Sequence, residues 1–462
     1  MNTLIIIALS GVLMMFSGFM LRSKTGIRTL ALVLLFAAIV MNLLELRGIT
    51  LFDIDTNGML DFDGSDGRFA LLFTLVVNVS TFAFFLLSAK DMEKVGLNYS
   101  DYFALIFFIL SGVVLAASFK SLLMLFLGIE IISIPLYILT GSAKHNLKSN
   151  EASLKYFLMG SFSTGLMLMG IALVYGATGT FYTGVSYAFG DEKVPVLLIA
   201  GMMMLLFSMS FKVSAAPFHF WTPDVYDGAP TVFTSFMATI VKVAGFIAFM
   251  RLFEDAFGQI QSEWKLVVSL VAAATLFIGN ITAVFQQSVK RMLAYSSISQ
   301  AGFMMLAIFA MNADAKEGLI LYAGAYSLAT IGIFGVLAKM SDMSFDAFNG
   351  FAKQEPVIAG TLVIFLLSLA GIPLTAGFLS KFYMLKATIN AGSVWLAVFA
   401  VLMAAVSVYY YFRLIQAMYF KNGTTTIPHM SQGFRYTMIC LAVVTIVLGV
   451  FPNLLTNWLY FS

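Results

Sequence analysis

Charged residues are scarce in this chain. Only 11% of its 462 residues are Asp, Glu, Lys or Arg, whereas 60% are hydrophobic. About a quarter of the residues in a soluble domain are charged, so this composition excludes a soluble protein with a solvated surface. The net charge is only +3, which is too small for a nucleic-acid-binding surface.

Cysteine and histidine, the usual ligands of soft metals, are also scarce. The one cysteine, Cys440, excludes a disulfide within the chain, a thiolate zinc site and an iron–sulfur cluster. The three histidines are scattered along the sequence. Neither a phosphate-binding P-loop nor a dinucleotide-binding G-x-G-x-x-G pattern occurs. We therefore expect no metal, nucleotide or redox cofactor in this chain.

Long hydrophobic runs dominate the sequence instead. A membrane helix needs about 20 apolar residues. Hydropathy predicts fourteen such runs, near residues 2–21, 29–46, 69–88, 102–119, 121–140, 153–175, 194–221, 229–252, 265–285, 292–311, 317–339, 357–389, 393–416 and 434–460. The runs do not alternate as the strands of a membrane barrel do, and lipid-exposed backbone must satisfy its own hydrogen bonds. We therefore predict an all-α polytopic membrane protein with about fourteen transmembrane helices.

Two runs are too long for one membrane crossing. As continuous helices, 194–221 and 357–389 would extend about 42 and 50 Å, against a bilayer core of about 30 Å. Pro217 interrupts the first, and Gly371 and Pro373 interrupt the second. Each is expected to form two half-helices joined by an irregular link. Interrupted helices in matching places indicate a transport pathway, although such breaks can also be simple packing kinks.

The interrupted runs are the seventh and the twelfth. Their spacing predicts two five-helix repeats, helices 4–8 and 9–13, which are inverted because each contains an odd number of crossings. The predicted domains are helices 1–3 in residues 1–100, the first repeat in 101–252, the second in 265–416, and a final helix in 417–462. Most basic loop residues follow odd-numbered runs, so the positive-inside rule predicts both termini on the outer side.

Four charged residues lie near the middle of the predicted spans or beside their interruptions: Glu130, Lys212, Lys242 and Lys381. A charge at the centre of a membrane helix costs about 2.5–3.5 kcal/mol on insertion scales, so such residues face the protein interior or internal water. Glu130 is the only carboxylate deep within a span and is therefore the expected partner of Lys212 or Lys242. Because burial disfavours a charged lysine, a partner that can be withdrawn would make these groups a proton relay. The alternative is a static charge that holds the helices together.

Two further residues are weaker candidates. Lys155 lies two residues into the sixth span, where it could join the relay or extend to the membrane interface. His219 lies in the irregular link of the seventh span and could shuttle protons between Lys212 and water, or could be a structural histidine. Lys290 and Arg291, at the start of the tenth span, are expected to be interfacial anchors.

Several stretches carry a family resemblance: G-I-E-I-I-S-I-P-L-Y at 128–137, N-E-A-S-L-K-Y-F-L-M-G at 150–160, F-K-V-S-A-A-P-F-H-F-W-T-P-D-V-Y-D-G-A-P-T at 211–231, V-K-R-M-L-A-Y-S-S-I-S-Q-A-G-F at 289–303 and A-G-I-P-L-T-A-G-F-L-S-K-F at 370–382. In these the chain resembles the subunit N family of bacterial NADH–quinone oxidoreductase, respiratory complex I. That family is related to the antiporter-like subunits L and M and to Mrp-type cation/proton antiporters. The resemblance covers about residues 60 to 420.

The resemblance implies fourteen helices, two inverted repeats and broken helices seven and twelve. It implies a proton-relay role for Glu130, Lys212, Lys242 and Lys381, and places Lys155 and His219 along the same hydrated axis. Two residues depart from the family pattern: Gln300 stands where many relatives have histidine, and Val232 replaces a proline. We expect the missing histidine to remove one titratable step from the second repeat.

The resemblance also implies the setting in which the chain works. It predicts a proton-translocating subunit of the bacterial inner (plasma) membrane, in contact with the lipid bilayer and not with nucleic acid. NADH, FMN, iron–sulfur clusters and quinone would be bound by the other membrane and peripheral subunits of complex I. The alternative is a subunit of an Mrp-type Na⁺/H⁺ antiporter without a redox partner.

Overall fold

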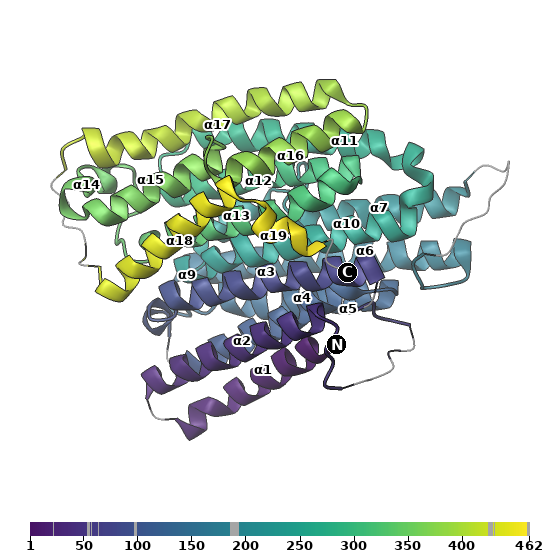
Figure 1. The fold of residues 1–462 in the computed structure, drawn as a ribbon, viewed down its shortest axis with the longest axis horizontal. Helices are drawn as coiled ribbons and strands as arrows, with labels where there is room; N and C mark the ends of the chain where they lie inside the picture. The colour runs from purple at the N-terminus through teal and green to yellow at the C-terminus, as the bar shows by residue number, and fades with distance from the viewer. Residues whose placement is uncertain are drawn as a thin grey trace.

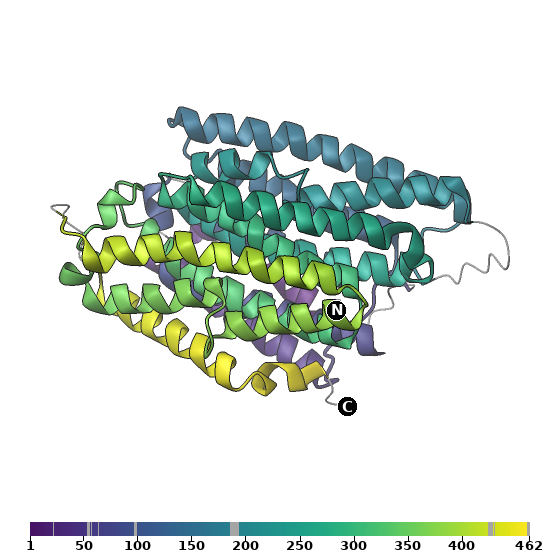
Figure 2. The same cartoon turned by 90° about the horizontal axis from the view of Figure 1, so that it is seen from above.

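The computed structural model describes residues 1–462 except 22, 53–55, 57, 63, 97–98, 185–193, 424–427, 429 and 460–462, and it leaves out the side chains of 64 and 65. Its regular structure in the described residues is helical, with isolated β-bridges such as Leu60–Phe119 in place of a sheet. The helices run side by side along the long axis of the molecule (Figure 1), and a view turned by 90° shows the same arrangement (Figure 2). The predicted all-α membrane fold is confirmed.

The helices follow one another along the chain from the N-terminus to the C-terminus. The chain begins with α1 (Asn2–Met20), α2 (Lys24–Leu46), α3 (Gly64–Ser88) and the short turn η1 (Asp91–Lys94). The first predicted repeat contains α4 (Tyr99–Ser118), α5 (Leu122–Thr140), α6 (Leu147–Thr178), α7 (Val196–Lys212), α8 (Trp221–Gly228), α9 (Thr231–Phe236), the π-helical turn η2 (Met237–Val241) and α10 (Lys242–Phe257).

The second half continues after the turn η3 (Gly258–Ile260). It contains α11 (Gln261–Val284), α12 (Val289–Ala310), α13 (Ala313–Leu337), η4 (Asp346–Phe348), α14 (Phe351–Gln354), α15 (Pro356–Ala370), α16 (Ala376–Asn390) and α17 (Val394–Phe420). The chain finishes with α18 (Gln432–Val450), α19 (Asn453–Thr456) and η5 (Asn457–Leu459). The predicted domain boundaries at 252, 265 and 416 fall a few residues inside α10, α11 and α17.

Length and composition identify eleven membrane-crossing candidates among the described residues, and one of them, Thr231–Val284, spans several successive helices. The shorter apolar helices α7 and α15 each end at an irregular link. The count of fourteen and the inverted repeats stay predictions. The last run was predicted too long: α18 ends at Val450, because Pro452 two residues later cannot continue the helix.

Helices α12 and α13 form the centre of the bundle. Their most apolar windows are 94% and 100% buried, whereas those of α1, α6 and α18 are 33% buried. In Figure 1, α1 and α2 lie at one edge, α17 lies at the opposite edge, and α12 and α13 lie between them. Exposed apolar side chains on the outer helices, such as Phe19 and Phe162, are expected in a protein whose surface contacts lipid.

Small residues allow two helix pairs to cross closely. A Cβ on Gly128 of α5 would lie 2.7 Å from the backbone nitrogen of Ala116 on α4. A Cβ on Gly279 of α11 would lie 2.5 Å from the backbone nitrogen of Ser299 on α12. Membrane helices associate through such close contacts of small residues. The two crossings occupy corresponding places in the two predicted repeats.

Both predicted interruptions are present. Helix α7 ends at Lys212 and α8 begins at Trp221, and the link between them contains a cis Ala216–Pro217 peptide bond. The amide of Ala216 donates to the Thr275 hydroxyl of α11, 2.8 Å away. Helix α15 ends at Ala370 and is followed by Gly371 with φ +83°, a left-handed conformation that favours glycine.

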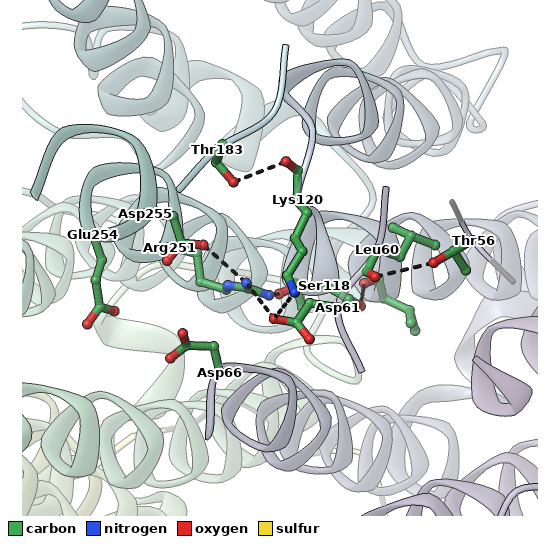
Figure 3. Close-up of polar contacts among 12 residues, drawn as sticks. Thr56, Leu60, Asp61, Asp66, Ser118, Lys120, Thr183, Arg251, Glu254 and Asp255 are labelled. Atoms are coloured by element: carbon green, nitrogen blue, oxygen red, sulfur yellow. Dashed lines mark hydrogen bonds and ion pairs between the residues drawn. The ribbon is translucent and has the colours of Figure 1, made fainter. Parts of the chain in front are cut away.

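The end of the bundle that holds the α4–α5 link, residues 119–121, is named here the α4–α5 end. A buried arginine, Arg251, connects several segments at this end. The Arg251 side chain is 2% exposed and donates to the Ala117 carbonyl at 2.7 Å and to Asp255 at 3.1 Å. Its guanidinium lies 3.8 Å from Asp61, which also pairs with Lys120 at 3.2 Å. Figure 3 shows Arg251 and Lys120 meeting the Asp61 carboxylate. The contacts join the segment before α3 to the first repeat.

Candidate functional site

Glu130 and Lys212 face each other across α5 and α7. The Glu130 Oε1 atom lies 3.9 Å from the Lys212 Nζ atom, and the two side chains are 21% and 10% exposed. Thr164 of α6 lies between them: its hydroxyl donates to Glu130 at 2.6 Å and accepts from Lys212 at 3.4 Å. Lys212 also donates to the Ser133 hydroxyl at 3.0 Å. Of the two lysines expected to partner Glu130, the structure brings Lys212 to it.

Lys242 lies deeper in the bundle. It is the first residue of α10, directly after the π-helical turn η2, and it is 2% exposed. Its Nζ donates to the carbonyl and the hydroxyl of Ser297 on α12, both at 2.9 Å, and lies 5.7 Å from the centre of the Tyr226 ring. None of the ion pairs among the described residues involves Lys242. The π-helical turn was not expected from hydropathy.

Lys381 lies beside the second helix break. It extends from α16 to the C-terminal end of α15, where its Nζ donates to the carbonyls of Leu369 at 2.7 Å and Ala370 at 3.2 Å. A Cβ on Gly371 would lie 2.9 Å from the Lys381 Cδ, so the side chain passes over a position where glycine is needed. Free carbonyls at a helix C-terminus favour a cation, which explains how the ammonium is held with no carboxylate partner among the residues that the structure describes.

Gln300 connects the Lys242 and Lys381 regions. It lies three residues after Ser297 on α12, and its Nε2 donates at 3.0 Å both to the Leu369 carbonyl and to the Tyr411 hydroxyl. The Tyr322 hydroxyl donates to its Oε1. The amide therefore joins α12, α13, α15 and α17. A cavity of about 10 Å³ beside Gln300 and Lys381 is the size of about one water molecule.

Lys155 lies away from this buried series. Its side chain is 42% exposed and pairs with Glu151 at 2.8 Å and with Asp224 of α8 at 3.0 Å. Arg291 contacts the same aspartate at 3.2 Å. Of the two alternatives for Lys155, the surface location agrees with the structure. Arg291 also lies at the surface, as expected.

Lys290 is the buried lysine that the sequence did not predict. It is 5% exposed, so its side chain packs inside the protein and not on its surface. Its Nζ donates to the carbonyls of Asp227 at 2.9 Å and Ala229 at 2.7 Å. Asp227 lies in the last turn of the short helix α8 and Ala229 is its C-cap, and the last carbonyls of a helix lack intrahelical donors. A single lysine at the start of a span carries no signal that separates this contact from an interfacial one.

His219 is 5% exposed within the α7–α8 link, and its Nδ1 atom lacks a hydrogen-bond partner in the part of the chain that the structure describes. It makes no direct hydrogen bond to Lys212 there. Other buried polar atoms without a partner lie in the same region, on Ser210, Ser214, Thr222 and Ser235. Buried polar groups of this kind are ordinarily satisfied by internal water, so the link is a polar region of the interior.

The sequence is similar to those of known proteins. The family described as "NADH:quinone oxidoreductase/Mrp antiporter, TM" matches residues 118–407. The NADH-quinone oxidoreductase subunit N of Cytophaga hutchinsonii is 39% identical, with 98% of each chain covered. That of Flavobacterium psychrophilum is 35% identical, over 99% of this chain and 100% of the relative.

Solved structures show the same fold. A chain of respiratory complex I from Thermus thermophilus with bound aureothin superposes with a TM-score of 0.84 at 31% identity, covering 98% of both chains. A chain of the Mrp complex from Dietzia has a TM-score of 0.85 at 18% identity, covering 99% of this chain and 95% of that one, which shows a common fold alone. On the full-length identity to its relatives, this chain belongs to the NADH-quinone oxidoreductase subunit N family.

Proposed function

We propose that this chain is an antiporter-like membrane-arm subunit of a proton-translocating NADH–quinone oxidoreductase. In this proposal it moves protons while its partner subunits oxidise NADH and reduce quinone. The observation that carries the proposal is the buried polar series through the bundle: Glu130 with Lys212, Lys242 with Ser297, and Gln300 with Lys381 through the Leu369 carbonyl. The subunit N relatives, which cover nearly the whole chain, support the assignment.

The first part of the relay is the Glu130–Lys212 pair. The carboxylate stabilises the ammonium, and Thr164 holds both groups through one hydroxyl. A movement of α7 at its break would lengthen the 3.9 Å contact and weaken this stabilisation, so that Lys212 releases its proton. Internal water near the buried polar atoms of the α7–α8 link would receive it, and His219 is a secondary candidate for the same transfer.

The second part extends from Lys242 to Lys381. The Ser297 hydroxyl can accept one proton and donate another, and it contacts Lys242 directly. An amide does not exchange protons in this way, so Gln300 is proposed to hold the Tyr322 and Tyr411 hydroxyls in place. The small cavity beside Lys381 has room for about one water that completes the path.

Redox cofactors and quinone are proposed to bind partner subunits and not this chain, which is supported by the single cysteine and the absence of nucleotide motifs. The basic loop residues support a location in the bacterial inner membrane with both termini on the periplasmic side. The α5–α6 end of the bundle, which holds residues 141–146, would then be cytoplasmic.

Affinity purification of this chain from native membranes tests the proposal. We expect NADH–quinone reductase activity to copurify, and the reconstituted complex to acidify the vesicle side that corresponds to the periplasm. Sodium/proton exchange without NADH, in a preparation that lacks redox subunits, would instead support the Mrp-type alternative. The difference between 39% identity to a subunit N relative and 18% to the Mrp chain favours the first result.

A further inference from the structure

A cavity of about 500 Å³ opens at the α5–α6 end of the bundle, away from the buried lysines. Its volume is within the range of small-molecule sites. The first turns of α4, the last turn of α5 and the α5–α6 link surround it. Both polar and apolar side chains line it, among them Asp101, Tyr102, Tyr137, Ile138, Lys144 and His145.

The charged groups of the cavity are available to a ligand. Lys144 and His145 are exposed, and Asp101 is half-buried. None of the ion pairs in the described ranges involves any of the three, and the Asp101 carboxylate accepts only a long bond of 3.5 Å from Ser100 among the hydrogen bonds found there. The cavity thus offers the ammonium group of Lys144, the imidazole N–H of His145 and the carboxylate of Asp101. That set complements a ligand with both a phosphate and an ammonium group.

An apolar track leads into the cavity along α5. The track is formed by two side chains one helical turn apart on the half of α5 nearest the cavity, Ile134 and Ile138, which are 53% and 55% exposed. Ile138 also lines the cavity. A hydrophobic track along a membrane helix that ends in a charged cavity matches a lipid, with its acyl chain on the track and its headgroup in the cavity. A free phosphate ester would make no use of the track.

We propose that this cavity binds the headgroup of a membrane phospholipid that carries a primary amine, such as phosphatidylethanolamine. Lys144 and His145 contact its phosphate, Asp101 contacts its ammonium group, and an acyl chain lies on the α5 track. The site has a link to the relay, because Tyr137 lines the cavity one helical turn after Ser133, which contacts Lys212. The inference goes beyond the proposed function and does not depend on it.

Photo-crosslinking in the native membrane tests the site directly. Membranes that contain the full chain are fused with phosphatidylcholine vesicles carrying a trace of photoactivatable phosphatidylethanolamine, and labelled peptides are mapped by mass spectrometry. We expect labelling in residues 99–105 and 137–145, and about tenfold less with a phosphatidylcholine probe, because its trimethylated amine cannot donate to Asp101. Equal labelling by the two probes, or labelling of neither segment, would overturn the proposal.

Variants separate the two halves of the headgroup contact. Lys144→Ala with His145→Ala should lower labelling by the ethanolamine probe about tenfold, and Asp101→Asn should remove the preference for it over the choline probe. Lys90→Ala is the matched control, because it removes an exposed positive charge from the same end of the bundle but outside the cavity, and it should label as wild type. Wild-type labelling of the double variant would contradict the proposal. A cross-link from Lys144 to a neighbouring subunit, with no labelling by either lipid probe, would contradict it as well.

Discussion

Gln300 and Lys381, on different helices, donate hydrogen bonds to the same carbonyl oxygen, that of Leu369, at 3.0 and 2.7 Å. This carbonyl belongs to the last turn of α15, immediately before the helix break. The Gln300 amide and the Lys381 ammonium therefore lie next to each other, because both bind the same backbone oxygen. Gln300, which stands where many relatives have histidine, thus contacts the same backbone oxygen as Lys381.

Gln300→Leu should impair proton pumping while the protein still assembles. Leucine approximates the volume of glutamine but leaves the Tyr322 hydroxyl without its acceptor and the Leu369 carbonyl with one donor fewer. We expect pumping in vesicles to fall about tenfold, which corresponds to the loss of one buried hydrogen-bond partner. Gln432→Leu, at an exposed amide at the start of α18, is the control and should pump normally. Normal pumping by Gln300→Leu would remove the amide from the path.

Glu130→Gln should lower coupled NADH–quinone turnover and pumping by at least about tenfold, the lower range for loss of a proton-transfer group. The amide can still accept from Thr164, so the packing of α5 against α6 is kept while the charge that stabilises Lys212 is lost. Assembly is checked on a native gel. Glu151→Gln removes an exposed carboxylate, 64% accessible, and should leave both rates unchanged. An assembled Glu130→Gln protein with wild-type rates would show that the carboxylate is not needed.

Arg251→Ala should destabilise the α4–α5 end by about 3 kcal/mol, because it leaves the buried Ala117 carbonyl and the Asp255 carboxylate without their charged donor. The measurement is thermal unfolding of the purified protein in detergent. Lys120→Ala removes the other cation that contacts Asp61 in Figure 3, but its side chain is 47% exposed, so its loss should cost less than about 1 kcal/mol. Equal losses of stability in Arg251→Ala and Lys120→Ala would contradict the claim that the buried arginine contributes more than the exposed lysine.

Local sequence signals were sufficient for the helix breaks, and they narrowed the partner of Glu130 to two lysines. Proline and glycine act on the backbone where they stand, so Pro217 and Gly371 located both interruptions. The high cost of a lone charge in a membrane helix predicted that Glu130, the only deep carboxylate, would accompany Lys212 or Lys242, and the structure places it beside Lys212.

The other features of the site depend on contacts between helices, which the local sequence does not indicate. Lys155 and Lys290 both lie near the start of a span. Lys155 pairs with Asp224 at the surface, whereas Lys290 is buried and donates to backbone carbonyls at the end of α8. The partners of Gln300 come from three other helices, which no local pattern encodes. The π-helical turn before Lys242 lies within a run that hydropathy describes as one regular helix.

Lys381→Arg provides the most direct test of the central claim, that buried lysines release and regain protons. Arginine keeps the charge and the approximate size, so an ammonium that only anchors the α15 carbonyls tolerates the substitution, whereas a relay does not, because arginine stays charged throughout the cycle. The measurement is proton pumping by the reconstituted complex, beside the quinone reductase rate and assembly on a native gel. The account predicts an assembled Lys381→Arg protein that has lost pumping, as Lys381→Met also should. Normal pumping at wild-type turnover by Lys381→Arg would make Lys381 a structural charge and contradict the account.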